Sequence, residues 1–131
     1  MQQLAVVLID KAELGVDIRR AYEQKDIPAL REIIDERLPR LIGNVRRLHD
    51  LHRRTWESLY KPFGWEILDR RYAGLVARLE AVAHRLQPFV DGQVERVEEL
   101  ECPRLPVKDW PAGQIGFASL YRHITSSTIC S

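Results

Sequence analysis

The sequence predicts an all-α protein: an antiparallel helical bundle of three main helices, followed by an extended, proline-containing C-terminal tail. Three long stretches of the 131-residue chain place apolar residues at alternating steps of three and four, the spacing of one helix face. Prolines and glycines gather between the second and third stretches and after the third, where they end helices. The length fits one domain, and a hydrophobic content of 45% is ordinary for a globular protein.

The first expected helix runs from about Gln2 to Glu23. Its apolar positions are spaced for one face, although Lys11 interrupts them: Leu4, Val7, Leu8, Leu14, Ile18 and Tyr22. Gly15 lies inside this helix and costs about 1 kcal/mol relative to alanine. We therefore expect either close packing or a weak point there.

The second expected helix starts after Lys25. Asp26 is placed to cap it and Pro28 falls in its first turn, a position that tolerates proline. It runs to about Tyr60 and carries a seam for antiparallel packing: Leu30, Ile34, Leu38, Leu41, Val45, Leu48, His52, Thr55 and Leu59. Pro39 removes one backbone hydrogen bond, so a kink or a break is expected there.

The turn at 61–64 (Lys-Pro-Phe-Gly) separates this helix from a third, expected from about Trp65 to Val90. Its seam repeats the same spacing without a fault: Leu68, Tyr72, Leu75, Leu79, Val82, Leu86 and Val90. Arg71, Arg78 and Arg85 recur every seven residues beside it, where basic groups meet the acids of a neighbouring helix. Asp91-Gly92 supplies a stop, and a short acidic helix over about 94–100 follows.

From Cys102 onward the pattern changes, because three prolines fall within nine residues: Pro103, Pro106 and Pro111. We expect residues 1–131 to form one helical domain, with a bundle over 1–101 and an extended docking tail over 102–131. The first helix begins at Gln2 without a capping residue, and a strand near the C-terminus would have no partner in the chain. Both features are typical of a piece of a larger protein.

Composition excludes several classes of partner. With 20 basic and 19 acidic residues the net charge is +1, which predicts binding neither to nucleic acid nor to a membrane. No leader and no stretch of about 20 apolar residues is visible. Cys102 and Cys130 have the spacing of free thiols in an intracellular protein, with a disulfide that ties down the tail as the alternative. These features predict a cytoplasmic location.

No catalytic, cofactor or metal site is expected. His49 and His52 are three residues apart, a spacing that can chelate a metal, but further ligands are not evident and a histidine pair at the edge of the core is the simpler reading. The adjacent Asp35 and Glu36 resemble a general acid and base, yet their mid-helix position favours a solvated face. The sequence contains neither an activated cysteine nor a glycine loop for phosphate.

Aromatic residues are densest around the turn between the second and third helices. Trp56, Tyr60, Phe63 and Trp65 predict packing at a hairpin tip or, alternatively, an exposed anchor for another domain or subunit. Together with Trp110 of the tail, these residues are the candidate interface.

The block Lys61-Pro-Phe-Gly-Trp-Glu-Ile-Leu-Asp-Arg-Arg-Tyr72 resembles the C-terminal region of bacterial family 20 glycoside hydrolases, the β-N-acetylhexosaminidases. Residues 75–80 and 85–86, the acidic stretch 97–101, residues 104–106 and the terminal 121–126 continue the resemblance, which covers about half of the chain closely. The subgroup in question has an N-terminal mixed domain, a central TIM barrel and a C-terminal helical domain.

The resemblance implies a non-catalytic accessory domain that packs against the catalytic barrel of the same parent chain, mediates a homodimer, or does both. The family's catalytic Asp–Glu pair lies at a barrel strand end, a context that Asp35 and Glu36 lack. A chain of this length also cannot hold a (β/α)₈ barrel, which needs about 250 residues. A free-standing helical module that binds protein partners is the alternative.

Overall fold

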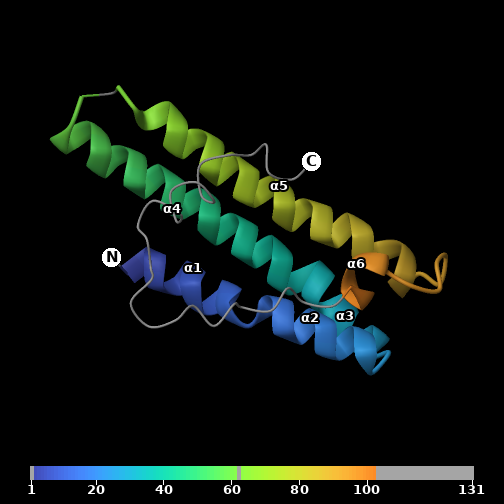
Figure 1. Ribbon diagram of the computed structural model, residues 1–131. Coiled ribbons are helices and arrows are strands. Elements are labelled where there is room, and N and C mark those ends of the chain that lie inside the picture. Colours follow the sequence, from blue (N-terminus) through green and yellow to red (C-terminus); the bar gives the residue numbers. More distant parts are fainter. Residues whose placement is uncertain (1, 62, 103–131) are drawn as a thin grey trace, which may run out of the picture.

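The computed structural model describes residues 2–61 and 63–102, and this part of the chain is an all-α bundle. Its frame is an antiparallel hairpin of two long helices, α4 (Leu38–Leu59) and α5 (Trp65–Val90). Helices α1 (Gln2–Ala12) and α2 (Leu14–Glu23) pack along one end of this hairpin (Figure 1). Three short elements, α3 (Ile27–Glu32), the π-helix η1 (Ile33–Arg37) and α6 (Glu98–Glu101), complete the fold.

The first predicted helix is two helices, which corrects its expected continuity. The break falls at Glu13, two residues before Gly15, so a weak point does occur in this region. Close packing at Gly15 was wrong, because a Cβ placed there meets no atom within 4 Å. Helix α2 ends at Glu23, and Lys25, two residues further on, has a left-handed φ of +53° although it is not glycine.

The second predicted stretch begins as expected and is interrupted near Pro39. The Asp26 carboxylate accepts a hydrogen bond of 3.0 Å from the Ala29 amide and so caps α3. The interruption takes the form of the π-helical turn η1, in which the Leu38 amide bonds back to the Ile33 carbonyl. A wider turn suits this position, because the ring of Pro39 would clash with the carbonyl four residues earlier in a regular α-helix.

Helix α5 has the predicted bounds, and its end is well defined. Gly92 adopts a φ of +72°, its amide bonds the Phe89 carbonyl, and the Gln93 amide bonds the Pro88 carbonyl at 2.8 Å. This pair of bonds is a Schellman motif, which requires a left-handed residue at Gly92.

Helix α6 starts four residues later than predicted. Val97 is extended, only 6% exposed, and donates its amide to the hydroxyl of Tyr22 at 3.0 Å. Val97 is thus held in an extended conformation against α2, directly before α6 begins.

The core lies at the end of the hairpin that α1, α2 and α3 cover. The aliphatic residues that reach 1% exposure or less are Leu30, Leu38, Leu41 and Val45. Beyond Val45 no residue of α4 is fully buried, and in α5 only Trp65 is buried before Leu79. The seam predicted to continue through Thr55 and Leu59 is therefore exposed at its end, with Leu59 69% exposed.

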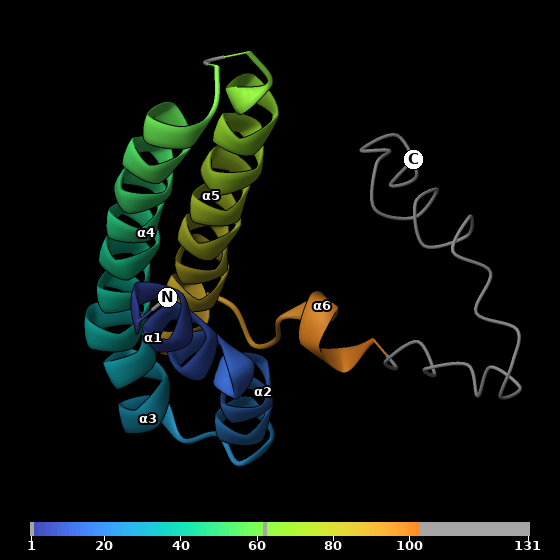
Figure 2. The same cartoon turned by 90° about the vertical axis from the view of Figure 1, so that its left-hand side faces the viewer.

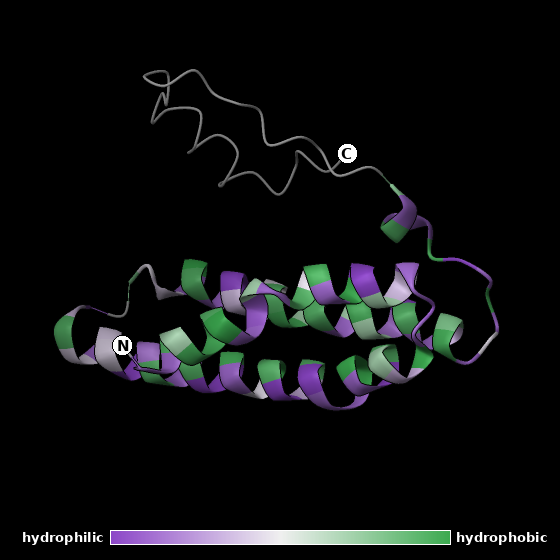
Figure 3. Ribbon diagram, turned by 90° about the horizontal axis from the view of Figure 1, so that it is seen from below, coloured by the Kyte–Doolittle hydropathy of each residue, from purple (hydrophilic) through white to green (hydrophobic). Residues whose placement is uncertain are grey.

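The half of the hairpin that carries this exposed seam stands clear of α1, α2 and α3 (Figure 2). We call it the arm: residues 46–59 of α4, the turn, and residues 65–78 of α5. Hydrophobic and hydrophilic residues alternate along its helices as they do along the rest of the bundle (Figure 3). No helix in the described ranges combines the length and the apolar character needed to cross a membrane.

Candidate functional site

The arm is held together by aromatic side chains instead of an aliphatic core. Trp65, at the start of α5, is 7% exposed and lies between residues of α4. Its ring stacks on that of His49 with centroids 5.7 Å apart and meets the edge of His52 at 5.2 Å. Trp56 packs on it from the tip side at 5.9 Å, and Tyr72 contacts His49 at 4.6 Å. These contacts join the two helices where no third helix covers them.

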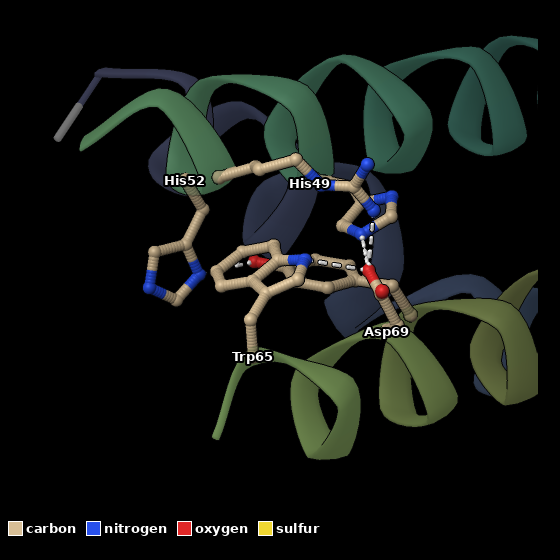
Figure 4. A network of polar contacts seen from close by, with 6 residues as sticks. His49, His52, Trp65 and Asp69 are labelled. Atoms are coloured by element: carbon tan, nitrogen blue, oxygen red, sulfur yellow. Dashed lines mark hydrogen bonds and ion pairs between the residues drawn. The ribbon is translucent and has the colours of Figure 1, made fainter. Parts of the chain in front are cut away.

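A single carboxylate oxygen organises the polar side of this cluster. Asp69 Oδ1 lies 2.7 Å from His49 Nε2 and accepts hydrogen bonds of 2.6 Å from both Arg53 Nη2 and Trp65 Nε1 (Figure 4). The guanidinium of Arg53 also lies over the Trp65 ring, 5.6 Å from its centroid, and its Nε atom is buried without a partner. Asp69 therefore fixes the relative position of α4 and α5.

The charges of the network match its geometry. Partial burial opposes ionisation of Asp69, but the hydrogen bonds from His49, Arg53 and Trp65 prevail and hold its pKa below the ordinary value of 3.8. Burial raises the pKa of Tyr72 above its ordinary value, and its hydroxyl lies 3.0 Å from His52 Nδ1. The carboxylate is thus ionised at neutral pH, as a fixed acceptor needs to be.

The two histidines that could have bound a metal face different partners. The polar partner of His49 is the Asp69 carboxylate and that of His52 is the Tyr72 hydroxyl, so the pair lies at the edge of the hairpin packing. Among residues 2–61 and 63–102 no three side chains of the metal-binding types come together.

A hollow of about 300 Å³ lies beside His49 and Tyr72 on the same side of the arm. Its one carboxylate, that of Glu80, pairs with Arg46 at 3.2 Å.

The predicted interface residues occupy different environments. Phe63 and Tyr60 at the tip are 88% and 62% exposed, and Trp56 is half-buried and packs on Tyr60 with ring centroids 4.9 Å apart. Trp65, by contrast, is buried inside the chain, where it packs between the two helices of the hairpin. Trp110 and Cys130 lie outside the described residues, as does the tail from residue 103.

Sequence reasoning missed the central residue of the cluster, Asp69. Its signal was present, because it stands four residues after Trp65 and so shares one face of α5 with it. Asp35 and Glu36, weighed as an acid pair, are exposed on η1 as the solvated-face reading predicted. Cys102 is exposed and forms no disulfide with any residue that the structure describes.

Helix α1 exposes a second apolar surface, which we call the outer α1 face. Its inner side contributes Val7 to the core, and Gln3 and Asp10 bond the side chain of Asn44. On the outer side Leu8 is 55% and Ile9 is 74% exposed, and the other apolar positions of this side are also open: Leu4, Ala5 and Ala12. A helix that is apolar on both sides is normally covered on both.

Two comparisons with known proteins bear on this arrangement. Residues 1–117 match a family model described as the glycoside hydrolase 20C C-terminal domain. A search of curated proteins finds no significant match.

Proposed function

Starting from the fact that the chain belongs to the glycoside hydrolase 20C C-terminal domain family, we propose that it is the non-catalytic accessory domain of a β-N-acetylhexosaminidase. In this role it packs against the catalytic barrel of the same polypeptide. The observation that carries the proposal is the outer α1 face, where Leu8 and Ile9 are more than half exposed on a helix whose other side is already buried.

The apolar composition of the outer α1 face favours a permanent contact with another domain. Scattered exposed apolar residues are common on soluble proteins, but a contiguous helix face without a charged side chain is typical of an interface. Removing this apolar surface from water would stabilise the contact between the two domains by about 25 cal/mol for each Å² buried. In a C-terminal domain, α1 is also the helix nearest in sequence to whatever domain precedes it, so it is well placed to contact that domain.

The proposal is tested in the parent enzyme with Leu8→Lys and Ile9→Lys. A lysine in a buried contact is costly, so we expect faster proteolytic release of this domain and a lower temperature of half-inactivation towards a chromogenic N-acetylhexosaminide. Val94→Lys is the matched control, since Val94 is also apolar and 42% exposed but lies on the loop after α5. Equal behaviour of all three variants, or turnover by this chain alone, contradicts the proposal.

The exposed tip favours a second contact. Three exposed hydrophobic residues lie at the far end of the arm: Leu59, Tyr60 and Phe63. Exposed aromatic side chains of this kind often anchor subunit interfaces. We propose a homodimer of the parent enzyme through this tip, with a free-standing interaction module as the alternative function of the domain. Light scattering of the enzyme with Phe63→Ser tests it, because an unchanged mass contradicts the dimer. The cytoplasmic location stays a prediction.

A further inference from the structure

We propose that one side of the arm is a docking surface for an acidic, amphipathic helix of the preceding catalytic domain. The inference rests on the proposed function and identifies a second surface, distinct from the outer α1 face, together with the chemistry of its partner. We call this surface the arm face. It is formed by Leu48, Leu51 and Thr55 of α4 and by Ile67 and Arg71 of α5.

The arm face lies on the side of the hairpin away from the Asp69 network. Residues two apart on a helix project in nearly opposite directions. Leu51 is two residues from both His49 and Arg53, and Ile67 is two residues from Asp69. Both apolar side chains therefore point away from the Asp69 network, where they are 45% and 55% exposed.

The arm face continues an interface that already exists within the chain. Asn44, which bonds Gln3 and Asp10 of α1, is followed by Leu48, Leu51 and Thr55 at steps of four, three and four, so all lie on one side of α4. Asn44 is the residue of this row whose side chain hydrogen-bonds α1. Along this row Leu48 is half-buried against the core, whereas Leu51 and Thr55 are exposed.

Helix α1 also sets the direction of the missing partner. Its residue Gln3 meets Asn44, while Asp10 reaches further towards the start of α4 and pairs with Arg40 at 3.8 Å. Helix α1 therefore runs antiparallel to α4, with its N-terminal end towards the arm (Figure 1). In a C-terminal domain the preceding domain joins at that end, which places it beside the arm face.

Two rows of arginines specify the charge of the partner. Arg40, Arg47 and Arg54 recur every seven residues along α4, and the first pairs with Asp10 of α1. Arg71, Arg78 and Arg85 recur in the same way along α5, and the last pairs with Glu99 of α6, with Nε and Oε1 2.7 Å apart.

The members of these two rows that lie on the arm lack such partners. Arg47, Arg54, Arg71 and Arg78 have no ion pair within residues 2–61 and 63–102. Each row is thus paired where a helix covers it and unpaired where the arm begins. The pattern fits a helix with an apolar centre and carboxylates on both edges, in which the charges set orientation and register.

A second copy of this chain is the weaker occupant. Two arm faces brought together would place arginine rows near arginine rows, and like charges at an interface disfavour the complex. The acidic helix of the catalytic domain satisfies both the exposed leucines and the arginines.

Zero-length carbodiimide cross-linking in the parent enzyme tests the assignment. The variant Arg71→Lys keeps the charge and supplies an amine that couples to a touching carboxylate. The matched control is Arg70→Lys, an exposed neighbour about 100° further round the same helix. We expect a cross-link from position 71 to an aspartate or glutamate of the catalytic domain in the same chain, and its loss in the control.

Cross-linking a mixture of isotopically labelled and unlabelled enzyme distinguishes a cross-link within one chain from a cross-link between two copies, because only the latter joins a labelled peptide to an unlabelled one. A cross-link between two copies, or no cross-link above that of the control, overturns the inference. Charge reversal by Arg71→Glu with Arg78→Glu is expected to lower the temperature of half-inactivation, whereas Arg70→Glu leaves it unchanged. If Leu8→Lys and Ile9→Lys release the domain but the cross-link is absent, the arm face alone is wrong and the proposed function stands.

Discussion

Trp65 Nε1 donates a hydrogen bond of 2.6 Å to Asp69 Oδ1, the same oxygen that Arg53 and His49 reach from the opposite helix. The two residues lie one turn apart on α5, so the helix itself presents the donor to the acceptor. Because Trp65 is also the one buried side chain of the arm within the described residues, at 7% exposure, it joins the packing and the polar network of the hairpin.

Replacing Trp65 with phenylalanine should therefore loosen the arm. Trp65→Phe keeps an aromatic ring but removes the Nε1 donor and leaves a small void, for an expected loss of about 1–2 kcal/mol in the free energy of unfolding. Denaturant unfolding measures it. Trp56→Phe is the control, since its donor bonds the Lys61 carbonyl near the surface. An equal or larger loss in the control would contradict the central role of Trp65.

The depressed pKa of Asp69 predicts acid lability. The carboxylate is held ionised in the folded state, so its contribution to stability is complete above the ordinary pKa of 3.8 and is lost as the pH falls through the lower folded value. Unfolding curves of Asp69→Asn should depend less on pH in this window than those of the unaltered chain. The same slope in both would show that other carboxylates carry the acid transition.

The aliphatic core should be far less tolerant than the arm face. Leu38 is 0% exposed, and Leu38→Ala removes buried methyl groups and leaves a cavity, for an expected loss of about 2–5 kcal/mol. Leu51→Ala, at a position 45% exposed, should cost about 0.5 kcal/mol in this chain alone. Thermal unfolding compares the two, and similar losses would place Leu51 in a covered site.

Two glycines of opposite conformation give a matched pair. Gly92 has a φ of +72°, so Gly92→Ala should destabilise by about 1–2 kcal/mol. Gly74 lies within α5, and a Cβ there meets no atom within 4 Å, so Gly74→Ala should stabilise by about 0.5–1 kcal/mol. Opposite shifts in the midpoint of thermal unfolding are expected, and shifts of the same sign would contradict the assigned cap.

The sequence by itself determined the helical class, the bounds of α5, the Asp26 cap and the disturbance near Pro39. Each depends on contacts among residues close in the chain: hydrophobic spacing, a capping carboxylate, a missing amide. The exposed acid pair at Asp35 and Glu36 followed from the same local reasoning.

Tertiary structure alone decided which half of each seam is buried. The spacing of Thr55 and Leu59 is as regular as that of Leu41 and Val45, yet only the latter are covered, because α1 ends its contact near Asn44. The tertiary structure likewise decided that Asp69 accepts hydrogen bonds from three side chains, which lie up to 20 positions away in the sequence. Burial and convergence depend on which helices meet, and periodicity within one helix carries no information about its neighbours.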